Sequence, residues 1–173
     1  MKWLVDASHS EVQFKVKHLV ISTVTGTFKE FEGALEAESE DFDNAKVDFS
    51  IKANSISTNQ NDRDNHLKSG DFFDAEKYPS LSFKNGILKK KSKEDYSLTG
   101  ELTIKDVTKT VELNVEYGGV SKDPWGNTKA GFEVTGKINR TEFGLTWNAT
   151  LETGGVLVGE SIALDINIQL VKA

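Results

Sequence analysis

The sequence IALDINIQL at residues 162–170 decides the fold class of this chain. A large apolar side chain occupies every second position from Ile162 to Leu170, and Ala, Asp, Asn and Gln occupy the positions between them. A period of two is the period of a β-strand, so this segment predicts a strand with one buried face and one face in solvent.

The same alternation recurs along the chain. Val12, Phe14 and Val16 share one parity, and a further set of alternating apolar residues begins at Val47. In all, we predict strands near 2–6, 10–18, 24–37, 45–54, 80–88, 95–105, 109–118, 128–139 and 160–171. Phe28 and Phe31 differ in parity within the segment 24–37, which predicts a bulge or bend near Lys29–Glu30.

Regularly spaced antiparallel strands hide their edges best when the sheet closes on itself. We therefore predict an all-β fold, an extended antiparallel lipocalin-like β-barrel of about eight strands with one or two short helices at the barrel end. A sandwich of two sheets is the alternative. The chain has 173 residues and lacks long linkers and internal repeats, so we expect a single domain over residues 1–173.

The segment 57–78 is the one long stretch without strand alternation. Ser57 or Thr58 could cap a short helix that ends at Gly70. Helical spacing would then place three polar side chains on one face, namely Asn59, Arg63 and His66. The paired aromatic residues Phe72 and Phe73 follow, and we expect them to plug the adjacent end of the barrel. The segment is therefore either a structural lid or a direct ligand contact.

Among the lysines and arginines of the chain, only Arg63 and Arg140 are arginine. A guanidinium suits bidentate contact with a phosphate or carboxylate, or a buried structural ion pair. We expect the ion pair at both positions, beside the barrel end. The segment that begins at Arg140 would form a second element at that end.

Polar residues and glycines also continue the buried faces of the strands. His18 follows the apolar parity of Val12 to Val16, so its ring needs a partner in the protein, in water or in a ligand. Three glycines occupy inward positions, namely Gly26, Gly100 and Gly136. Each removes side-chain volume, which either opens a cavity or lets the strand bend.

Composition and motifs exclude several classes of function. The chain has no cysteine, which excludes disulfides and cysteine-ligated zinc. Its net charge of −6 disfavours binding to nucleic acid. We find no phosphate loop, dinucleotide fingerprint, nucleophile elbow or His-Glu-x-x-His motif, so we expect no catalytic residues. The three histidines are widely separated, and we expect no metal or cofactor.

The segment from Met1 to Asp6 has no long apolar core, and no later run approaches the length of a membrane span. We therefore expect a protein that does not span a membrane and lacks an export signal. Its expected location is the cytoplasm, or the periplasm if a signal peptide has been removed.

At several places the sequence resembles the YceI-like family of lipocalin-like barrels. The resembling segments are residues 6–10, 12–14 with His18, 26–28 with Phe31 and Gly33, 55–58, 63–67, 71–74 with 78–79, 100–104 with 108–109, 140–145 and 158–160. Their order and spacing fit throughout, so the resemblance covers essentially the whole chain.

The resemblance implies a tunnel that holds a long-chain isoprenoid, such as a polyprenyl phosphate or quinone, or a similar amphiphilic lipid. We expect non-catalytic binding, storage or transport. The apolar tail would lie among Phe14, Phe28, Phe49, Phe83, Leu102, Val134 and Trp147. The head group would lie near His18, Asn59 and Arg63.

Two alternatives stay open from the sequence. The protein could be an isomerase or hydrolase that uses His18 or His66 as a base, or a solid barrel that acts as a stress or interaction module. A homodimer is also possible. If the interior is a tunnel, filling it by Phe49→Trp or Gly100→Phe should abolish tail binding and leave the fold intact.

Overall fold

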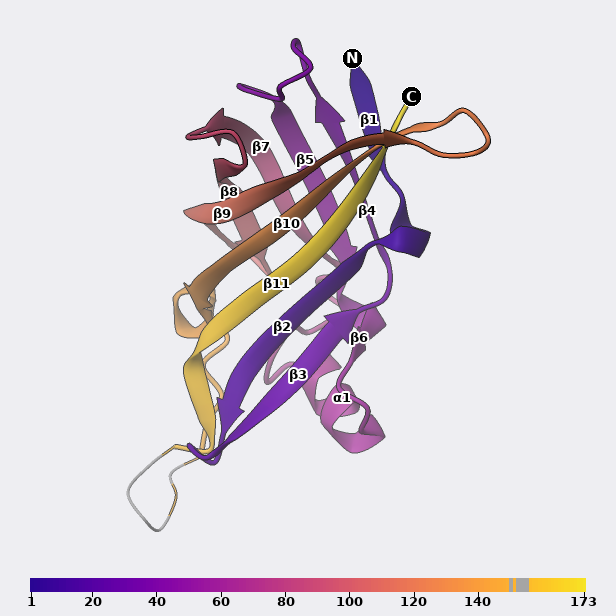
Figure 1. The fold of residues 1–173 in the computed structure, drawn as a ribbon. Coiled ribbons are helices and arrows are strands. Elements are labelled where there is room, and N and C mark those ends of the chain that lie inside the picture. Colours follow the sequence, from indigo (N-terminus) through magenta and orange to yellow (C-terminus); the bar gives the residue numbers. More distant parts are fainter. Residues whose placement is uncertain (150, 152–155) are drawn as a thin grey trace.

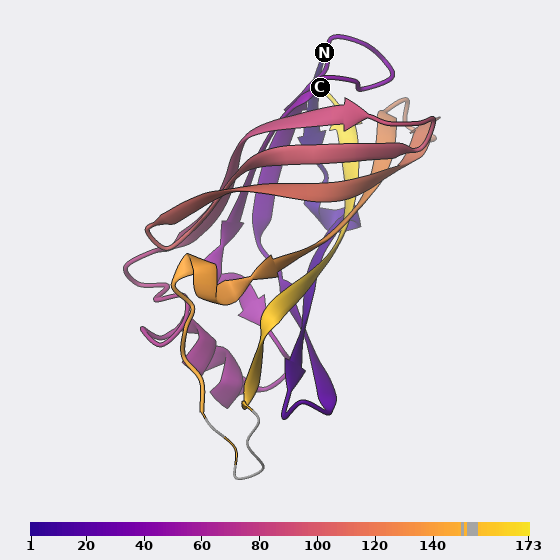
Figure 2. The same ribbon diagram turned by 90° about the vertical axis from the view of Figure 1, so that its left-hand side faces the viewer.

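A computed structural model describes residues 1–149, 151 and 156–173 as one antiparallel β-barrel (Figures 1 and 2). Eight strands close the ring in the order β1, β4, β5, β7, β8, β9, β10 and β11, and β11 pairs again with β1. The predicted fold class, a closed barrel of eight strands with a short helix at one end, is therefore confirmed.

The strands are Lys2–Val5 (β1), Glu11–His18 (β2), Ser22–Phe28 (β3), Phe31–Glu36 (β4), Lys46–Lys52 (β5), Ile56–Ser57 (β6), Ser80–Lys90 (β7), Asp95–Ile104 (β8), Val107–Lys122 (β9), Thr128–Asn139 (β10) and Val158–Lys172 (β11). The helices are the 3-10 turns Ala7–His9 (η1), Ala53–Ser55 (η2) and Arg140–Phe143 (η3), and the α-helix Asn61–Lys68 (α1). Within the described ranges, no helix is both long and apolar enough to cross a bilayer.

The strand that decided the fold class, β11, organises the barrel wall. Its C-terminal half pairs with β1, where Leu170 faces Val5, and its N-terminal half pairs with β2, where Ile166 faces Val12. The η1 turn separates β1 from β2, so two short strands lie along one edge of β11. The ribbon β2–β3–β6 thereby extends the wall beyond the ring, toward α1 (Figure 1).

The prediction of one bent strand over 24–37 is wrong, because the chain forms two strands there. The break at Lys29–Glu30 lets β3 stay paired with β2 while β4 moves across to β1 and β5. The parity change between Phe28 and Phe31 therefore marks a change of pairing partner rather than a bulge. The η1 turn separates β1 from β2, and the break separates β3 from β4. The pair β2–β3 and the pair β1–β4 therefore divide at the same height of the barrel.

Phe42 seals the end of the barrel that lies beside the two chain termini, which we call the closed end. This ring is fully buried and packs 5.2 Å from Trp3, 5.3 Å from Phe132 and 5.5 Å from Tyr117, measured between ring centroids. Phe42 lies in the connection between β4 and β5, in a polar stretch of sequence. The sequence analysis did not identify this plug.

The other end, which we call the α1 end, is covered by α1, by the segment that follows it and by η3 (Figure 2). Phe72 and Phe73 pack into the core there, as predicted, and Phe73 lies 5.8 Å from Phe28. The predicted caps Ser57 and Thr58 are wrong. The helix begins only at Asn61, after Gln60, which makes no side-chain cap.

Candidate ligand-binding site

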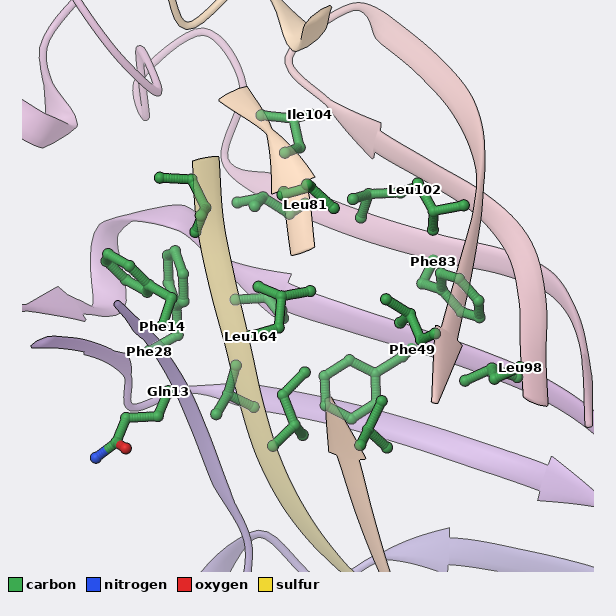
Figure 3. Close-up of a pocket in the computed structure, with 18 of the residues that line it drawn as sticks. Gln13, Phe14, Phe28, Phe49, Leu81, Phe83, Leu98, Leu102, Ile104 and Leu164 are labelled. Atoms are coloured by element: carbon green, nitrogen blue, oxygen red, sulfur yellow. The ribbon is translucent and has the colours of Figure 1, made fainter. Parts of the chain in front are cut away.

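The two core clusters of the barrel are joined by a cavity of about 230 Å³ whose facing surface is apolar throughout (Figure 3). Six of the residues predicted to contact a lipid tail line it: Phe14, Phe28, Phe49, Phe83, Leu102 and Val134. Because the wall presents no polar atom, the cavity can hold only the apolar part of a ligand.

The cavity runs along most of the barrel. At the closed end it reaches Leu88 and Phe132, which belong to the cluster around Phe42. At the α1 end it reaches Val16 on β2 and Val158 at the start of β11. An elongated apolar space of this kind matches a chain-like ligand better than a compact one.

Glycines shape the wall by receiving side chains from neighbouring strands. A Cβ atom added at Gly26 would lie 2.2 Å from Phe14 Cζ, and one at Gly136 would lie 2.6 Å from a methyl carbon of Leu113. A Cβ atom at Gly100 would lie 2.5 Å from Phe83 Cζ. The volume that each glycine vacates is therefore filled by a neighbour and does not itself form the cavity.

This packing contradicts the expectation that Gly100→Phe would leave the fold intact. A Cβ atom at Gly100 would also lie 2.9 Å from the Cα atom of Gly86, which is backbone and cannot rotate away. A phenyl group at that position would have to displace both Phe83 and strand β7. Filling the tunnel requires another position.

The other four predicted contact residues do not line the cavity. Asn59 is exposed and precedes α1, with φ of 63°, so it does not share a helical face with Arg63 and His66 as predicted. His18 lies at the end of β2 and pairs with Val158. Arg63 and Trp147 are half-buried at the α1 end. The structure thus gathers these polar residues outside the apolar wall.

Arg63 holds the start of α1 in place. Its Nε donates to Thr58 Oγ1 at 2.7 Å, and Nη2 donates to the Thr58 carbonyl at 2.8 Å. The carboxylate of Asp64 accepts from both the backbone N–H and the hydroxyl of Thr58, at 2.8 and 2.6 Å. Asp64 therefore organises the segment before the helix by hydrogen bonds rather than by pairing with Arg63.

Arg140 has the same kind of role on a larger scale. Its guanidinium is 3% exposed and donates to the carbonyls of Leu145, Trp147, Val158 and Gly159 at 2.6–3.2 Å. Burial lowers the pKa of Arg140 below its ordinary value. No ion pair of either arginine occurs within the described ranges, so the predicted ion pairs are wrong. Arg140 instead ties η3 and the segment after it to β11.

The histidine of α1 packs against aromatic rings. His66 lies 4.6 Å from Trp147 and 5.1 Å from Phe72, edge to face, and its Nε2 contacts Asp71 Oδ2 at 2.9 Å. Neither His66 nor His18 lines the cavity. An interior substrate would therefore not meet the two bases that the enzyme alternative requires.

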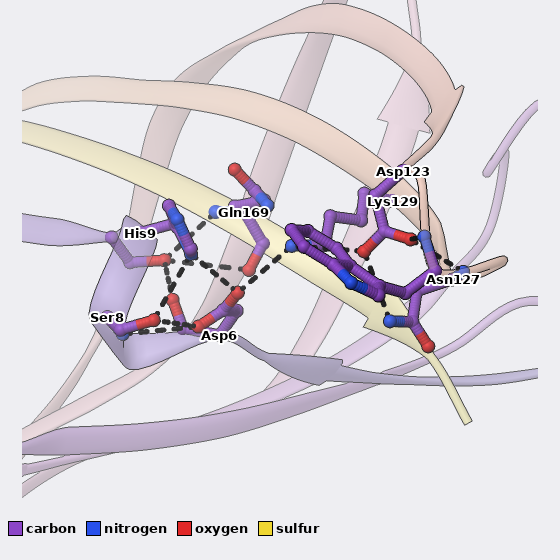
Figure 4. Close-up of polar contacts among 9 residues, drawn as sticks. Asp6, Ser8, His9, Asp123, Asn127, Lys129 and Gln169 are labelled. Atoms are coloured by element: carbon purple, nitrogen blue, oxygen red, sulfur yellow. Dashed lines mark hydrogen bonds and ion pairs between the residues drawn. The ribbon is translucent and has the colours of Figure 1, made fainter.

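A second polar cluster lies outside the barrel, around η1 (Figure 4). Asp6 accepts from Ser8 Oγ at 2.7 Å and contacts His9 Nδ1 at 2.9 Å, and these contacts hold its pKa at about 2. Lys129 lies 3.5 Å from Asp6 and 3.7 Å from Asp123. The Ser8 hydroxyl contacts the same ring nitrogen of His9, Nδ1, that contacts Asp6, at 3.1 Å. A hydrolase triad places the serine on one imidazole nitrogen and the carboxylate on the other, so this cluster is not arranged as one.

The sequence analysis missed cavity residues that carry the same signal as the predicted ones. Leu164 and Ile166 alternate inward in β11, and Val16 does so in β2. Their parity alone would have identified them. Leu67 and Phe73 also line the cavity from the α1 end, but no strand period marks them because they lie outside the sheet.

Comparison with known proteins gives one consistent result. The model of the YceI-like domain family matches residues 3–170. A UPF0312 protein of Staphylococcus aureus (strain bovine RF122) is 39% identical over 165 residues, which cover 95% of this chain and 94% of the relative.

Solved structures share the architecture. The crystal structure of the YCEI protein of Campylobacter jejuni is 37% identical, with a TM-score of 0.74 over 97% of this chain and 96% of that one. A polyisoprenoid binding domain from Saccharophagus degradans, described as implicated in plant cell wall breakdown, is 13% identical. It has a TM-score of 0.67 over 99% and 98% of the two chains, so its likeness is one of fold.

Proposed function

Because the chain belongs to the YceI-like family, we propose that it binds a long-chain isoprenoid or a similar amphiphilic lipid and holds the tail inside the barrel. The observation that carries this proposal is the elongated cavity with an entirely apolar surface. The ligand class is suggested by the polyisoprenoid binding domain that shares the fold.

The energetics favour binding by the tail alone. Apolar burial contributes about 25 cal/mol for each Å² removed from water, so a few hundred Å² of hydrocarbon supplies several kcal/mol without a polar contact. The protein would therefore select ligands by the width and length of the chain. We infer a storage or carrier role, in which the barrel shields the tail from water and performs no chemistry on it.

The head group would then lie at the α1 end, outside the apolar wall. Phe42 and its neighbours seal the opposite end, and His18, Asn59 and Arg63 all lie toward the α1 end. We propose these three as neighbours of the head group. Their contribution to affinity should be smaller than that of the tail, because groups near solvent gain little from a hydrogen bond.

Native mass spectrometry of the purified protein, followed by organic extraction, tests the proposal. The expected result is a stoichiometric isoprenoid or other long-chain amphiphile. If the protein is empty, the same measurement is repeated after incubation with polyprenyl phosphate and with a long-chain quinone. A protein that stays empty in both incubations would refute the proposed function.

A matched pair of variants locates the ligand. Val134→Trp adds an indole ring to the cavity wall, whereas Glu133→Trp adds the same ring at the neighbouring exposed position on the outside of β10. Retention of ligand should fall for Val134→Trp and stay unchanged for Glu133→Trp. Equal retention by the two variants would place the ligand outside the barrel.

A further inference from the structure

The turn between β2 and β3 presents three consecutive apolar side chains to solvent. Leu19 is 39% exposed, Val20 is 60% exposed and Ile21 is 86% exposed. We call these three residues the apolar turn. It forms the tip of the β2–β3 ribbon, at the α1 end of the barrel (Figure 1). Single exposed apolar residues are common on proteins, but a contiguous set at a protruding tip marks a contact surface.

The backbone of the apolar turn makes the choice of residues more unusual. Leu19 has φ of 55° and Val20 has φ of 66°, in the left-handed region that Gly and Asn adopt most easily. A β-branched residue such as Val20 is strained there. Asn or Gly would suit both the conformation and the exposure, so a requirement other than the stability of the turn favours large apolar side chains.

The apolar turn lies next to the α1 end of the cavity. Two residues that line the cavity lie close to the turn. Val16 precedes it by three residues in β2, and Val158, at the start of β11, pairs with His18. The N–H of Leu19 donates to the Leu157 carbonyl at 2.8 Å, which fixes the turn against the segment leading into β11. Apolar side chains therefore lie both at the exposed tip and at the adjacent end of the cavity.

The charge of the ribbon differs from that of the rest of the protein. The β2–β3 ribbon, residues 11–28, contains Lys15 and Lys17 and one acidic residue, Glu11, which lies at the end of β2 away from the apolar turn, although the whole chain has a net charge of −6. Both lysines are exposed on the outer face of β2. Each basic residue near an anionic membrane contributes about 1 kcal/mol of attraction. The ribbon thus combines an apolar tip with a basic flank, which is the pattern of an interfacial membrane contact.

We propose that the apolar turn docks on a lipid bilayer that contains anionic lipids. Leu19, Val20 and Ile21 enter the boundary between head groups and acyl chains, and Lys15 and Lys17 contact the anionic head groups. The α1 end then faces the membrane, so that a lipid tail can move between the bilayer and the cavity. This contact goes beyond the proposed function and can be measured whatever the cavity holds.

The absence of cysteine permits a direct test. Ile21→Cys is labelled with an environment-sensitive nitrobenzoxadiazole fluorophore. The matched control is Trp125→Cys. Trp125 is 83% exposed in the β9–β10 connection, and this connection lies at the closed end, where the start of β10 pairs with the end of β11. The vesicles are phosphatidylcholine alone or with about one third phosphatidylglycerol. We expect a blue shift and a gain in intensity at residue 21 with the anionic vesicles, and no change at residue 125.

Two unlabelled variants test the contributions separately. Val20→Ser with Ile21→Ser should weaken co-sedimentation with the anionic vesicles about tenfold or more, whereas Val120→Ser, at another exposed apolar position, should leave it unchanged. Lys15→Gln with Lys17→Gln should weaken binding and remove its dependence on phosphatidylglycerol.

Three results would overturn the proposal. The first is an unchanged spectrum at residue 21 with both kinds of vesicle. The second is an equal or larger response at residue 125. The third is a shift at residue 21 that occurs without vesicles and grows with protein concentration, because the turn would then contact a second copy of the chain. Each result leaves the lipid content of the cavity to be measured independently.

Discussion

Replacement of Gly26 by Ala should narrow the cavity by moving Phe14. Gly26 and Phe14 are paired directly across β2 and β3. The new Cβ atom would lie 2.2, 2.6 and 2.9 Å from three atoms of the Phe14 ring, whereas ordinary contacts begin near 3.4 Å. The ring must therefore move by about 1.2 Å or more to restore contact at its Cζ atom. Every close atom belongs to the far end of one side chain, so rotation of Phe14 can relieve the overlap.

The expected cost in stability is modest. Overpacking costs about 1–3 kcal/mol, whereas replacing a strand glycine by alanine regains about 0.5–1 kcal/mol through the unfolded state. Phe14 is half-buried and borders the cavity, so the overlap should fall at the lower end of its range. We expect the free energy of unfolding, measured in urea, to fall by no more than about 0.5 kcal/mol.

The effect on binding should be larger than the effect on stability. A ring displaced into the cavity excludes on the order of 100 Å² of ligand surface, equivalent to about 2.5 kcal/mol or an affinity loss on the order of 50-fold. Titration with the apolar fluorophore N-phenyl-1-naphthylamine measures this loss. Phe14→Leu introduced into Gly26→Ala should restore most of the affinity, because leucine lacks the ring atoms that overlap.

Gly131→Ala is the matched control, since a Cβ atom at Gly131 meets no atom within 4 Å. It should alter neither stability nor binding. Wild-type affinity in Gly26→Ala would contradict the assignment of Phe14 to the cavity wall. Failure of Phe14→Leu to rescue would show that the backbone, and not the ring, responds to the substitution.

Three further changes test other parts of the structure. Gly100→Ala should lower the free energy of unfolding in urea by about 2 kcal/mol, because its Cβ atom would meet backbone as well as Phe83; a neutral effect would contradict this packing. Arg140→Met should lower the free energy of unfolding by about 3 kcal/mol or more, because it removes the donor to four carbonyls. Arg140→Lys should not bring the free energy of unfolding back to the wild-type value. Since the pKa of Asp6 lies at about 2, below its ordinary 3.8, the stability it contributes is present above about pH 4 and is lost toward pH 2. Asp6→Asn should remove up to about 1 kcal/mol at neutral pH and should not matter near pH 2; an equal difference at both pH values would contradict this role.

The wall of the barrel could be predicted from the sequence because burial of one face imposes a period of two. That period placed β2, β5 and β11 and most of the cavity residues. It could not show that the segment 24–37 divides at Lys29–Glu30, since both halves keep strand-like composition and only the pairing partner changes. Nor could it show Phe42, a lone aromatic residue in a polar connection, whose burial depends on contacts distant in the sequence.

The contacts between glycines and aromatic rings could not be predicted, because they depend on the register between paired strands. The β2–β3 hairpin pairs Phe14 with Gly26 and His18 with Ser22, so the contact would follow from the sequence once the turn was centred on Val20. The turn lacks Gly and Asn, the usual markers, and so its centre was not evident. For Gly100 and Phe83 the contact is diagonal across β7 and β8 and passes a register shift, which no local pattern specifies.

The two ends of the barrel differ in a way that sets a direction for the ligand. At the closed end, Phe42 is fully buried among Trp3, Tyr117 and Phe132, so opening it would expose a tightly packed aromatic cluster. At the α1 end, the wall is a two-stranded extension with an exposed apolar tip, and the covering helix α1 contributes a single apolar side chain, Leu67, which is only half-buried. Moving this helix exposes less apolar surface than removing Phe42 from its fully buried site. A tail should therefore enter and leave at the α1 end, and substitutions at Phe42 should change stability before they change the rate of ligand exchange.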